Sequence, residues 1–303
     1  MTGGAGFIGS HIAEVLSGEN DVRVIDDMST GSEANISTFL DRIELHRGSI
    51  LDPDLLTVAM KDIDYVFHEA ALPSVERSIK DPVMTNKVNV RGSLNVLEAA
   101  RENNVEKVIY ASSSSVYGAS QTLPKSETME TEPISPYGVS KLAVEHYCRI
   151  YNEIFDLRTT SLRYFNVYGP RQDPKSQYVA VVPRFITWAM AGEKLKVYDD
   201  GNQVRDFTFV RDTVEANLLV AENKASDGEV LNVAAGSTVS VNELAAMVFE
   251  LLGQDAGIEH APPRPGEIRD SWADISRAKE LLGYEPKYTM KEGMEVTVGS
   301  CRN

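Results

Sequence analysis

The chain has 303 residues, of which 42% are hydrophobic and 25% are charged. This composition supports one large core, or a core with a smaller second lobe, and excludes disordered and fibrous classes of protein. Its 30 basic residues are outnumbered by 45 acidic residues, which gives a formal net charge of −15. That charge opposes binding to nucleic acid and to anionic membranes.

No stretch of the sequence approaches the roughly 20 consecutive apolar residues of a membrane span, and no leader of the secretory type opens it. The expected location is therefore the cytoplasm. Cys148 and Cys301 lie far apart and lack the spacing of metal ligands. We expect neither a disulfide nor a bound metal.

A glycine-rich segment lies at the start, with Gly3, Gly6 and Gly9 in the spacing of a dinucleotide-binding loop. In such a loop one glycine makes a tight turn, one lets the backbone approach a pyrophosphate, and one lets a helix pack closely on its strand. A helix that begins near Ser10 would direct its free N–H groups at the phosphates. Taken alone the loop is a weak signal, because glycines are also common in ordinary turns.

Only Met1 and Thr2 precede Gly3, whereas a loop of this kind normally follows a buried apolar strand. That strand lies centrally in a doubly wound sheet. Its absence predicts unpaired backbone groups on the neighbouring strands and a hole in the core. We expect a late start of the chain, and a true absence of the strand stays open as the alternative.

Asp26 follows the β-type run 22–25, about 20 residues beyond the glycine loop. A carboxylate at this position accepts hydrogen bonds from the adenosine ribose of NAD. It would repel the 2′-phosphate of NADP, and neither Asp27 nor Met28 offers a cation to bind that phosphate. The sequence therefore predicts NAD as the cofactor.

The first half of the chain alternates β-type runs with helical stretches, which is typical of a parallel sheet with helical crossovers. Strands are expected at 22–25, 43–46, 65–68, 105–111 and 159–163, with long helices at 86–102 and 137–155. Beyond Asn166, connections that contain Gly, Pro and Asp separate shorter elements, which include 181–191, 211–222 and 241–252. We predict an α/β fold: a Rossmann-type doubly wound parallel sheet over residues 1–165, and a smaller, mainly substrate-binding α/β lobe over 166–303 from which some elements return to the main sheet.

Tyr137 and Lys141 lie four residues apart at the start of a predicted helix, so their side chains share one face. Pro136 immediately before them suits the entrance of a helix. A free tyrosine has a pKa near ~10, but a neighbouring ammonium and a positively charged nicotinamide both favour the phenolate. Tyr137 can thus accept a proton from a sugar hydroxyl. Taken alone, the pair is also compatible with an ordinary surface helix.

Four consecutive hydroxyls, Ser112 to Ser115, follow the predicted strand 105–111. Ligands of parallel sheets bind outside the carboxyl ends of the strands. One of these serines can therefore share a short hydrogen bond with the reacting oxygen. The others can satisfy local backbone groups of a turn.

From Gly3 to about Tyr288 the chain resembles the extended short-chain dehydrogenases/reductases, and within them the nucleotide-sugar 4-epimerases of the UDP-galactose or UDP-N-acetylgalactosamine type. The glycine loop, the serine run and the Tyr137/Lys141 pair carry part of this resemblance. The remaining motifs are His68-Glu-Ala-Ala71, Asn89, Leu162-Arg-Tyr-Phe-Asn-Val-Tyr-Gly-Pro170, Arg205-Asp206-Phe207, Arg264-Pro-Gly-Glu267 and Trp272-Ala-Asp274.

The resemblance implies an isomerase in which Ser113 is the catalytic hydroxyl, Tyr137 the base, and Lys141 its activator and a ribose contact. The base takes the proton of the sugar O4 while hydride leaves C4 for NAD. The 4-keto sugar then turns about its diphosphate and receives the hydride on its opposite face. NAD is regenerated in each turnover.

The resemblance also implies a set of cofactor contacts that begins in the glycine loop. Relatives usually place an Asp against the adenine amino group where this chain has Ser49, whose hydroxyl can still accept a hydrogen bond. The implied contacts are Gly3, Gly6, Phe7, Ile8, Gly9, Asp26, Asp27, Ser29, Gly31, Ser49, Ile50, Ala70, Ala71, Leu72, Asn89, Tyr137, Lys141 and Tyr164.

For the UDP-sugar substrate, the resemblance implies that Asn166, Arg205 and Arg264 anchor the diphosphate, since a guanidinium fork matches phosphate oxygens. A surface salt bridge is the alternative for either arginine taken singly. The implied substrate contacts are Ser74, Ser113, Ser114, Asn166, Val181, Val182, Lys196, Val197, Tyr198, Arg205, Arg264 and Ser271.

Ser271 bears on the choice of sugar. The resemblance implies that this position borders the sugar. Epimerases restricted to UDP-glucose and UDP-galactose have a tyrosine here that closes the sugar pocket, whereas epimerases that accept N-acetyl sugars have a small residue. Ser271 therefore favours UDP-N-acetylglucosamine and UDP-N-acetylgalactosamine as additional substrates. The stretches 71–74 and 171–174 resemble the same branch. An open wall permits the larger sugar without requiring it.

Three alternatives share part of this evidence. Nucleotide-sugar 4,6-dehydratases usually have an Asp-Glu pair where this chain has Ser114 and Ser115, so dehydration is disfavoured. UDP-glucuronate decarboxylases or epimerases, and other NAD-dependent enzymes that modify nucleotide sugars, stay open, because decarboxylation follows from oxidation at C4. A non-enzymatic NAD-binding scaffold or redox sensor is disfavoured by the complete catalytic set.

The resemblance finally implies a homodimer in which the helices 86–102 and 137–155 form a four-helix contact with their symmetry mates. Apolar residues on two faces of the second helix permit this contact but would equally suit a core. They include Val139, Leu142, Ala143 and Ile150.

Overall fold

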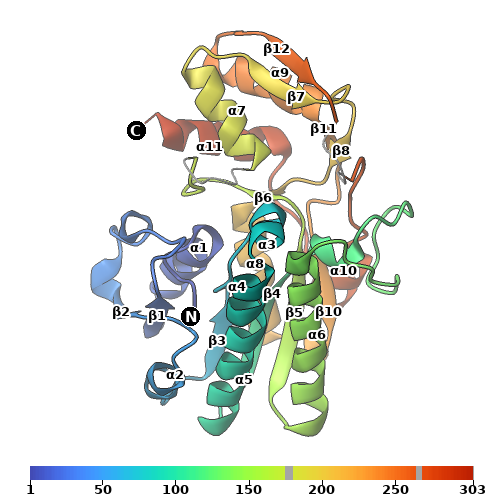
Figure 1. The fold of residues 1–303 in the computed structure, drawn as a ribbon. Helices are drawn as coiled ribbons and strands as arrows, with labels where there is room; N and C mark the ends of the chain where they lie inside the picture. Colours follow the sequence, from blue (N-terminus) through green and yellow to red (C-terminus); the bar gives the residue numbers. More distant parts are fainter. Residues whose placement is uncertain (175–179, 264–267, 303) are drawn as a thin grey trace.

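The computed structural model describes residues 1–174, 180–263 and 268–302. A lower body surrounds a parallel sheet, and an upper lobe of shorter elements lies over the carboxyl ends of its strands (Figure 1). Within these residues, none of the helices combines the length and the apolar character that a membrane span requires. Cys148 is buried and Cys301 is exposed, and both are free thiols.

The main sheet is parallel and confirms the predicted α/β, Rossmann-type class. On one side β10 (Val230–Val233), β5 (Arg158–Tyr164), β4 (Lys107–Ser113) and β3 (Tyr65–His68) lie in that order, and on the other β1 (Val22–Asp26) pairs with β2 (Ile43–Arg47). Thr2 bridges the two parts, because it pairs in parallel with both Ile25 and His68. The order of the strands reverses at this point, where doubly wound folds bind their ligands.

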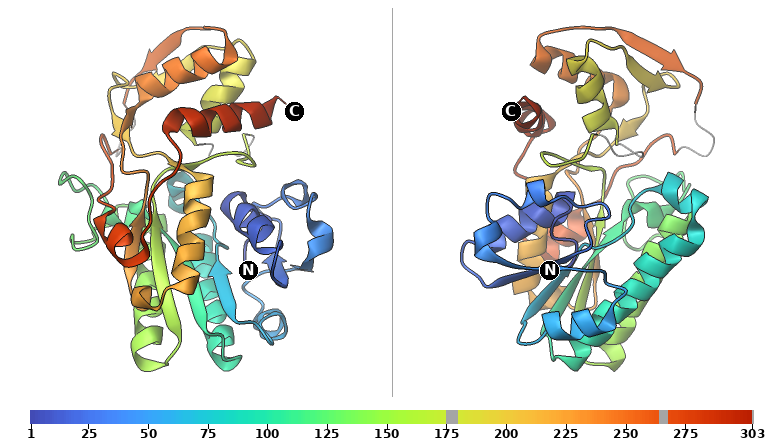
Figure 2. Two further views of the ribbon diagram at one scale, coloured as in Figure 1. Left: turned by 180° about the vertical axis from the view of Figure 1, so that it is seen from behind. Right: turned by 60° about the vertical axis from the view of Figure 1, so that its left-hand side comes forward.

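Helices cover both faces of the sheet (Figure 2). On one face lie α2 (Pro53–Ala59), α4 (Pro82–Asn86), α5 (Ser93–Glu102) and α6 (Pro136–Ile154), and on the other α1 (Phe7–Leu16), α8 (Val210–Glu222) and α10 (Ser276–Leu282). α3 (Val75–Lys80) packs against α4 and α6. Every residue of β4 is buried, as expected for a central strand of a parallel sheet.

Local sequence explains where the long helices begin. Ser135 caps α6 by accepting a hydrogen bond from the Gly138 N–H at 3.1 Å, and Pro136 occupies the first turn, where its missing N–H costs nothing. The predicted helix 86–102 is present with one irregularity. A π-helical segment, Lys87–Gly92, joins α4 to α5, and its wider turn contains the buried Asn89.

Two predicted boundaries were wrong by a few residues. α1 begins at Phe7 rather than near Ser10, because Gly6 is extended and acts as the N-cap. β4 ends at Ser113 rather than at residue 111, so Ser112 and Ser113 belong to the strand. Ser114 begins the short 3₁₀-helix Ser114–Tyr117. Other single 3₁₀ turns are Glu33–Asn35, Leu40–Arg42 and Lys224–Ser226.

The upper lobe has its own apolar core between α7 (Val181–Met190), α9 (Val241–Leu252) and α11 (Met290–Cys301). β7 (Leu195–Tyr198) pairs with β12 (Ile258–Ala261), and β8 (Val204–Arg205) pairs with β11 (Val239–Ser240). β6 (Val167–Tyr168) and β9 (Thr208–Phe209) pair where the chain passes between lobe and body. From this part of the chain, β10, α8 and α10 return to the main sheet.

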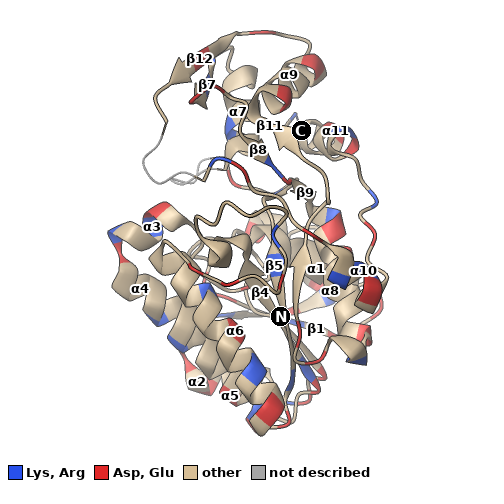
Figure 3. Ribbon diagram, turned by 90° about the vertical axis from the view of Figure 1, so that its right-hand side faces the viewer, with Lys and Arg blue, Asp and Glu red and all other residues tan. Residues whose placement is uncertain are grey.

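Acidic and basic residues are interspersed along the helices of the lower body (Figure 3). Exposed ion pairs such as Arg149 with Glu153, at 3.1 Å, contribute little to stability. The buried pair of Arg163 and Glu145, at 2.7 Å, is of a different kind, since removing either partner would leave an uncompensated charge in the core.

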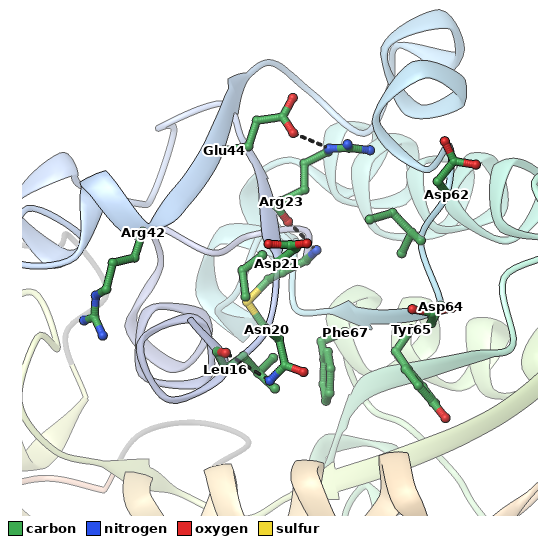
Figure 4. A pocket seen from close by; sticks show the side chains of 13 residues that line it. Leu16, Asn20, Asp21, Arg23, Arg42, Glu44, Asp62, Asp64, Tyr65 and Phe67 are labelled. Atoms are coloured by element: carbon green, nitrogen blue, oxygen red, sulfur yellow. Dashed lines mark hydrogen bonds and ion pairs between the residues drawn. The ribbon is translucent and has the colours of Figure 1, made fainter. Parts of the chain in front are cut away.

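A cavity of about 620 Å³ separates β1 from β3 (Figure 4). Between these strands, Thr2 donates its N–H to the Phe67 carbonyl at 3.0 Å, and the Met1 amine donates to the Arg23 carbonyl at 2.7 Å. The hole predicted from the missing strand is therefore present. Its lining residues are Met1, Leu16, Asn20, Asp21, Val22, Arg23, Arg42, Glu44, Asp62, Ile63, Asp64, Tyr65 and Phe67.

Backbone groups of both strands point into this cavity. Ile25 lies on the edge of β1 that borders the cavity, but its own groups are paired: its N–H donates to the Met1 carbonyl and its carbonyl accepts from Gly3. Alternate residues of a parallel strand face the same neighbour, so Arg23 on β1 and Tyr65 on β3 face the cavity too. The Met1 amine lies in line with them, and burial lowers its pKa to about 5.

We expect that appending Lys-Val-Leu-Val to Met1 raises the melting temperature by about 4 °C or more. The added strand would pair with both edges, and its lysine would lie near Asp21, Asp62 and Asp64 at the outer end of the cavity. Differential scanning calorimetry measures the effect, with a Lys-Asp-Gly-Asp extension as the matched control. Equal melting temperatures for the two extended proteins would show that the cavity does not accept a strand.

Candidate active site

A second cavity, of about 510 Å³, lies at the carboxyl ends of β1, β3 and β4. The glycine loop and α1 form one wall, and the start of α6 forms another. Among the predicted cofactor residues, those that line it are Gly3, Gly6, Phe7, Ile8, Gly9, Asp26, Asp27, Ser29, Ile50, Ala70, Ala71, Leu72, Tyr137, Lys141 and Tyr164. Ser74, a predicted substrate residue, lines it as well.

The glycine loop is so tightly packed that side chains are excluded from it. Gly3 has a positive φ of 70°, and a Cβ built on it would lie 2.6 Å from the Ala70 nitrogen. A Cβ on Gly9 would collide with the Gly3 carbonyl. The loop therefore brings backbone to the cavity, and the first turn of α1 adds N–H groups that suit a pyrophosphate. This cradle fits the phosphates of a dinucleotide.

Asp26 lies where a ribose contact requires it. Its carboxylate accepts hydrogen bonds from Ala5 N–H at 2.9 Å and Met28 N–H at 2.8 Å, one on each oxygen. Each oxygen of a carboxylate can accept a second bond, so capacity for ribose hydroxyls is left. Burial raises the pKa of Asp26, and the two backbone N–H groups oppose that shift. The geometry suits NAD as predicted.

Three predicted cofactor residues lie outside the cavity lining. Asn89 is buried and its amide is used internally: it accepts from Leu72 N–H at 2.7 Å and donates to the Leu72 carbonyl at 3.1 Å. It thus holds the segment that lines the cavity. A Cβ on Gly31 would lie 2.9 Å from an Asp26 oxygen, and the Ser49 hydroxyl accepts from Leu51 N–H at 3.3 Å.

Tyr137 and Lys141 line one end of the cavity, and Ser113 lies next to Tyr137 at the end of β4. Lys141 donates to the Ala111 carbonyl at 2.7 Å, and its Nζ lies 5.8 Å from the centre of the Tyr137 ring. Ser113 hydrogen-bonds to Tyr137 and also accepts from Ser115 N–H at 3.2 Å. A strand end and a helix start thus bring a hydroxyl, a phenol and an ammonium together.

Burial acts on Tyr137 against the ammonium and the nicotinamide that are expected to favour its phenolate. Burial raises the pKa of Tyr137 to about 12, which outweighs the opposing hydrogen bond from Ser113. Burial also lowers the pKa of Lys141 to about 8, although the carboxylates of Glu69 and Glu145 oppose this. The positive charge that stabilises a phenolate must therefore come in part from a bound ligand.

Glu145 was missed at the sequence level. It lies one turn beyond Lys141 on α6 and accepts from the Ser112 hydroxyl and from Arg163, at 2.9 Å from Nε and 2.7 Å from Nη2. These bonds fasten α6 to β4 beside Ser113 and to β5. The available signal was the spacing of four residues from Lys141, which repeats the helical face of the catalytic pair.

The predicted substrate residues Asn166, Arg205 and Ser271 are joined around Asp206. Asn166 donates to the Asp206 carbonyl at 2.9 Å, and the Asp206 N–H donates to the Ser271 carbonyl at 3.0 Å. Arg205 and Ser271 also form a parallel bridge. The Arg205 guanidinium donates to the backbone carbonyls of residues 268 and 269. Arg264 lies outside the described residues.

Asp206 organises these segments with its side chain and was not assigned a role from the sequence. Its carboxylate is buried and accepts from Ala235 N–H at 2.9 Å, Gly236 N–H at 3.2 Å and Ala273 N–H at 3.4 Å. Burial raises its pKa to about 6, against these hydrogen bonds. Its place between Arg205 and Phe207 in a family motif was the signal that could have identified it.

Of the remaining predicted substrate contacts, only some have side chains that are accessible. Val182 and Val197 lie in the core of the upper lobe, at 1% and 0% exposure. Because side chains alternate along a strand, β7 buries Val197 and turns Lys196 and Tyr198 outward. Val181 is partly buried at the start of α7, and Ser114 is partly buried beside Ser113.

Residues 1–234 match the model of the NAD dependent epimerase/dehydratase family. The chain belongs to this family. The cofactor is NAD, as the glycine loop and Asp26 indicate. A curated relative, UDP-glucose 4-epimerase of Mycolicibacterium smegmatis, is 38% identical over 308 residues, which cover 100% of this chain and 98% of the relative.

Two solved structures are similar over almost their whole length. UDP-N-acetylglucosamine 4-epimerase from Methanobrevibacter ruminantium, in complex with UDP-N-acetylmuramic acid, has a TM-score of 0.95 and 39% identity, with 99% of this chain and 96% of that chain covered. UDP-glucose 4-epimerase from Thermus thermophilus, in complex with NAD, has a TM-score of 0.91 and 36% identity, with 100% and 98% covered. The protein is thus an enzyme of the UDP-sugar epimerase family.

Proposed function

We propose that the protein interconverts the C4 epimers of UDP-hexoses on a tightly held NAD. The observation that carries this proposal is that Tyr137 and Lys141 line the same cavity as the glycine loop, and that Ser113 hydrogen-bonds to Tyr137. When bound there, NAD supplies the acceptor and donor of hydride. The protein's own groups then manage the proton on the sugar O4 and the position of the sugar.

In this proposal Tyr137 accepts the O4 proton as the C4–H bond breaks, and returns it when the bond re-forms on the opposite face. Ser113 shares a hydrogen bond with the same oxygen and with the Tyr137 hydroxyl. Lys141 is held by the Ala111 carbonyl, so its charge stays close to the phenol throughout. These groups can hold the reacting oxygen from one side while the sugar turns.

The diphosphate of the substrate is proposed to bind at Asn166, Arg205 and Arg264, with Lys196 and Tyr198 beside the uridine. Ser271 adjoins Arg205 and leaves room next to the sugar, which supports acceptance of N-acetyl groups. The similarity to a solved UDP-N-acetylglucosamine 4-epimerase points the same way. We infer that acetylated and non-acetylated UDP-hexoses are both substrates.

We also infer a homodimer. Large apolar side chains are exposed on α3, α4 and α6: Ile79 at 62%, Val83 at 77% and Val139 at 53%. α3 and α4 both contact α6, so these side chains lie on neighbouring helices at one side of the body. A second copy is expected to pair through the helices 86–102 and 137–155. Ile79 and Val83 lie beside these helices and Val139 lies on the second of them, so the same contact would cover all three side chains.

We expect Tyr137→Phe to abolish epimerisation while the protein keeps its NAD, because the substitution removes only the proton acceptor. The fall in kcat should be at least ~10²-fold, measured by chromatography of UDP-sugars, with NAD retention read from the ultraviolet spectrum. Tyr65→Phe is the matched control, since Tyr65 lies at the opposite end of β3. Near-normal turnover in Tyr137→Phe would refute the mechanism. If the wild-type protein instead releases CO₂ from UDP-glucuronate and forms no C4 epimers, the proposed reaction is wrong and the protein is a decarboxylase.

We expect Ser271→Tyr to suppress turnover of the acetylated sugars selectively. A tyrosine ring beside Arg205 would fill the space that an N-acetyl group needs, at a cost of about 1–3 kcal/mol, or roughly 10-fold to 100-fold in kcat/KM. Competition assays with UDP-N-acetylglucosamine and UDP-glucose measure the ratio. Ser271→Ala, which keeps the wall open, should leave that ratio unchanged. Equal losses on both sugars in Ser271→Tyr would remove Ser271 from the sugar pocket.

A further inference from the structure

Glu69 brings a carboxylate into the cofactor cavity, and the mechanism above does not use it. It follows directly after β3, and its backbone is clamped against the glycine loop. Its N–H donates to the Thr2 carbonyl at 3.1 Å, and a Cβ on Gly3 would lie 2.9 Å from its carbonyl carbon. The side chain therefore starts from a rigid point between the loop and the catalytic end of the cavity.

Two side chains from other elements hold this carboxylate in place. The Tyr164 hydroxyl, at the end of β5, donates to Glu69 Oε1 at 2.8 Å. Asn217 on α8 is buried and donates to the same Tyr164 hydroxyl at 2.8 Å. Because this hydroxyl is fixed by a donor behind it, its proton is directed at the carboxylate. The orientation of Glu69 is thus built into the fold.

Charged and titratable groups face Glu69 from every side of the cavity. Lys141 and Tyr137 approach from α6, Tyr164 from β5 and Tyr110 from β4. Burial raises the pKa of Glu69 to about 7, while Tyr164 and Lys141 oppose that shift. Glu69 in turn opposes the fall in the pKa of Lys141. The carboxylate and the ammonium act as opposite charges in one buried site.

We propose that the Glu69 carboxylate lowers the reduction potential of the NAD held in this cavity, offsetting the opposite effect of Lys141. The nicotinamide carries a positive charge when oxidised and none when reduced. A nearby carboxylate therefore stabilises the oxidised form, and a nearby ammonium destabilises it. The proposal assumes the NAD site assigned above, but it does not depend on which sugar is the substrate.

This balance matters for an epimerase because hydride must come back. Oxidation at C4 breaks the C4–H and O4–H bonds, with the electron pair and hydrogen passing to NAD and the proton to Tyr137. Return of both restores the alcohol with opposite configuration. With Lys141 alone, the cofactor would be a stronger oxidant, and the reduced state with a keto sugar would accumulate. Glu69 keeps the two states closer in free energy.

The test measures the NAD/NADH equilibrium of the holoenzyme against a soluble redox dye of known potential. Glu69→Gln keeps the shape and removes the charge. We expect the ratio of NADH to NAD to rise about 10-fold at a fixed dye potential, which corresponds to about 30 mV for a two-electron couple. Glu69→Asp, which keeps the charge, should restore most of the wild-type ratio. No epimerase activity is needed, so failure of the proposed function and failure of this inference are distinguishable.

Glu127→Gln is the matched control. Glu127 is also a partly buried carboxylate with a pKa raised by burial, but it accepts from Asn232 N–H at 2.7 Å and does not line the cofactor cavity. The ratio of NADH to NAD in Glu127→Gln should equal that of the wild type. If Glu69→Gln does not retain NAD, Tyr164→Phe tests the same carboxylate, because losing the hydrogen bond reduces its ionisation and must move the ratio in the same direction. An unchanged ratio in Glu69→Gln, or in Tyr164→Phe when that variant replaces it, would overturn the inference.

Discussion

The close contact between Gly3 and the backbone at Glu69 and Ala70 is the constraint on which the site depends. A single Cβ at Gly3 would lie 2.6 Å from the Ala70 nitrogen, so the glycine loop can reach the end of β3 only without a side chain. This contact sets the phosphate cradle beside the strand ends that carry the chemistry. It also places the Glu69 carboxylate between the cradle and Lys141.

Ser113, Tyr137 and Lys141 are held in place by a buried ion pair rather than by the glycine loop itself. Glu145 binds Ser112 and Arg163 and so fixes α6 against β4 and β5. Such a pair is costly to bury and adds little net stability, but losing one partner would leave a charge unpaired. Because Glu145 lies one turn from Lys141, its bonds hold the helix that carries Tyr137 and Lys141 against the strand that carries Ser113.

Local patterns predicted much of the fold and the centre of the site. The spacing of Tyr137 and Lys141 and the glycine spacing depend only on neighbouring residues, and both lead to groups that line one cavity. Properties that depend on packing were not predictable in this way. The burial of Val197 and the raised pKa of Tyr137 follow from what covers them.

Residues that act across elements were missed for the same reason. Glu69 and Glu145 acquire partners on β5 and β4 that lie 18 or more residues away in the sequence. The cavity between β1 and β3 was different, because the order of a doubly wound sheet specifies which strands flank such a gap. The structure has a cavity there, between Arg23 and Phe67.

In the proposed reaction, hydride leaves one carbon of the sugar and returns to the same carbon within one buried site. Mass spectrometry of product formed from UDP-glucose deuterated at C4, in ordinary water, tests this most directly. The account predicts UDP-galactose with deuterium still at C4 and no label in the solvent, because hydride held on NAD does not exchange. Loss of the label during epimerisation, or label retained with inversion at another carbon, would contradict it.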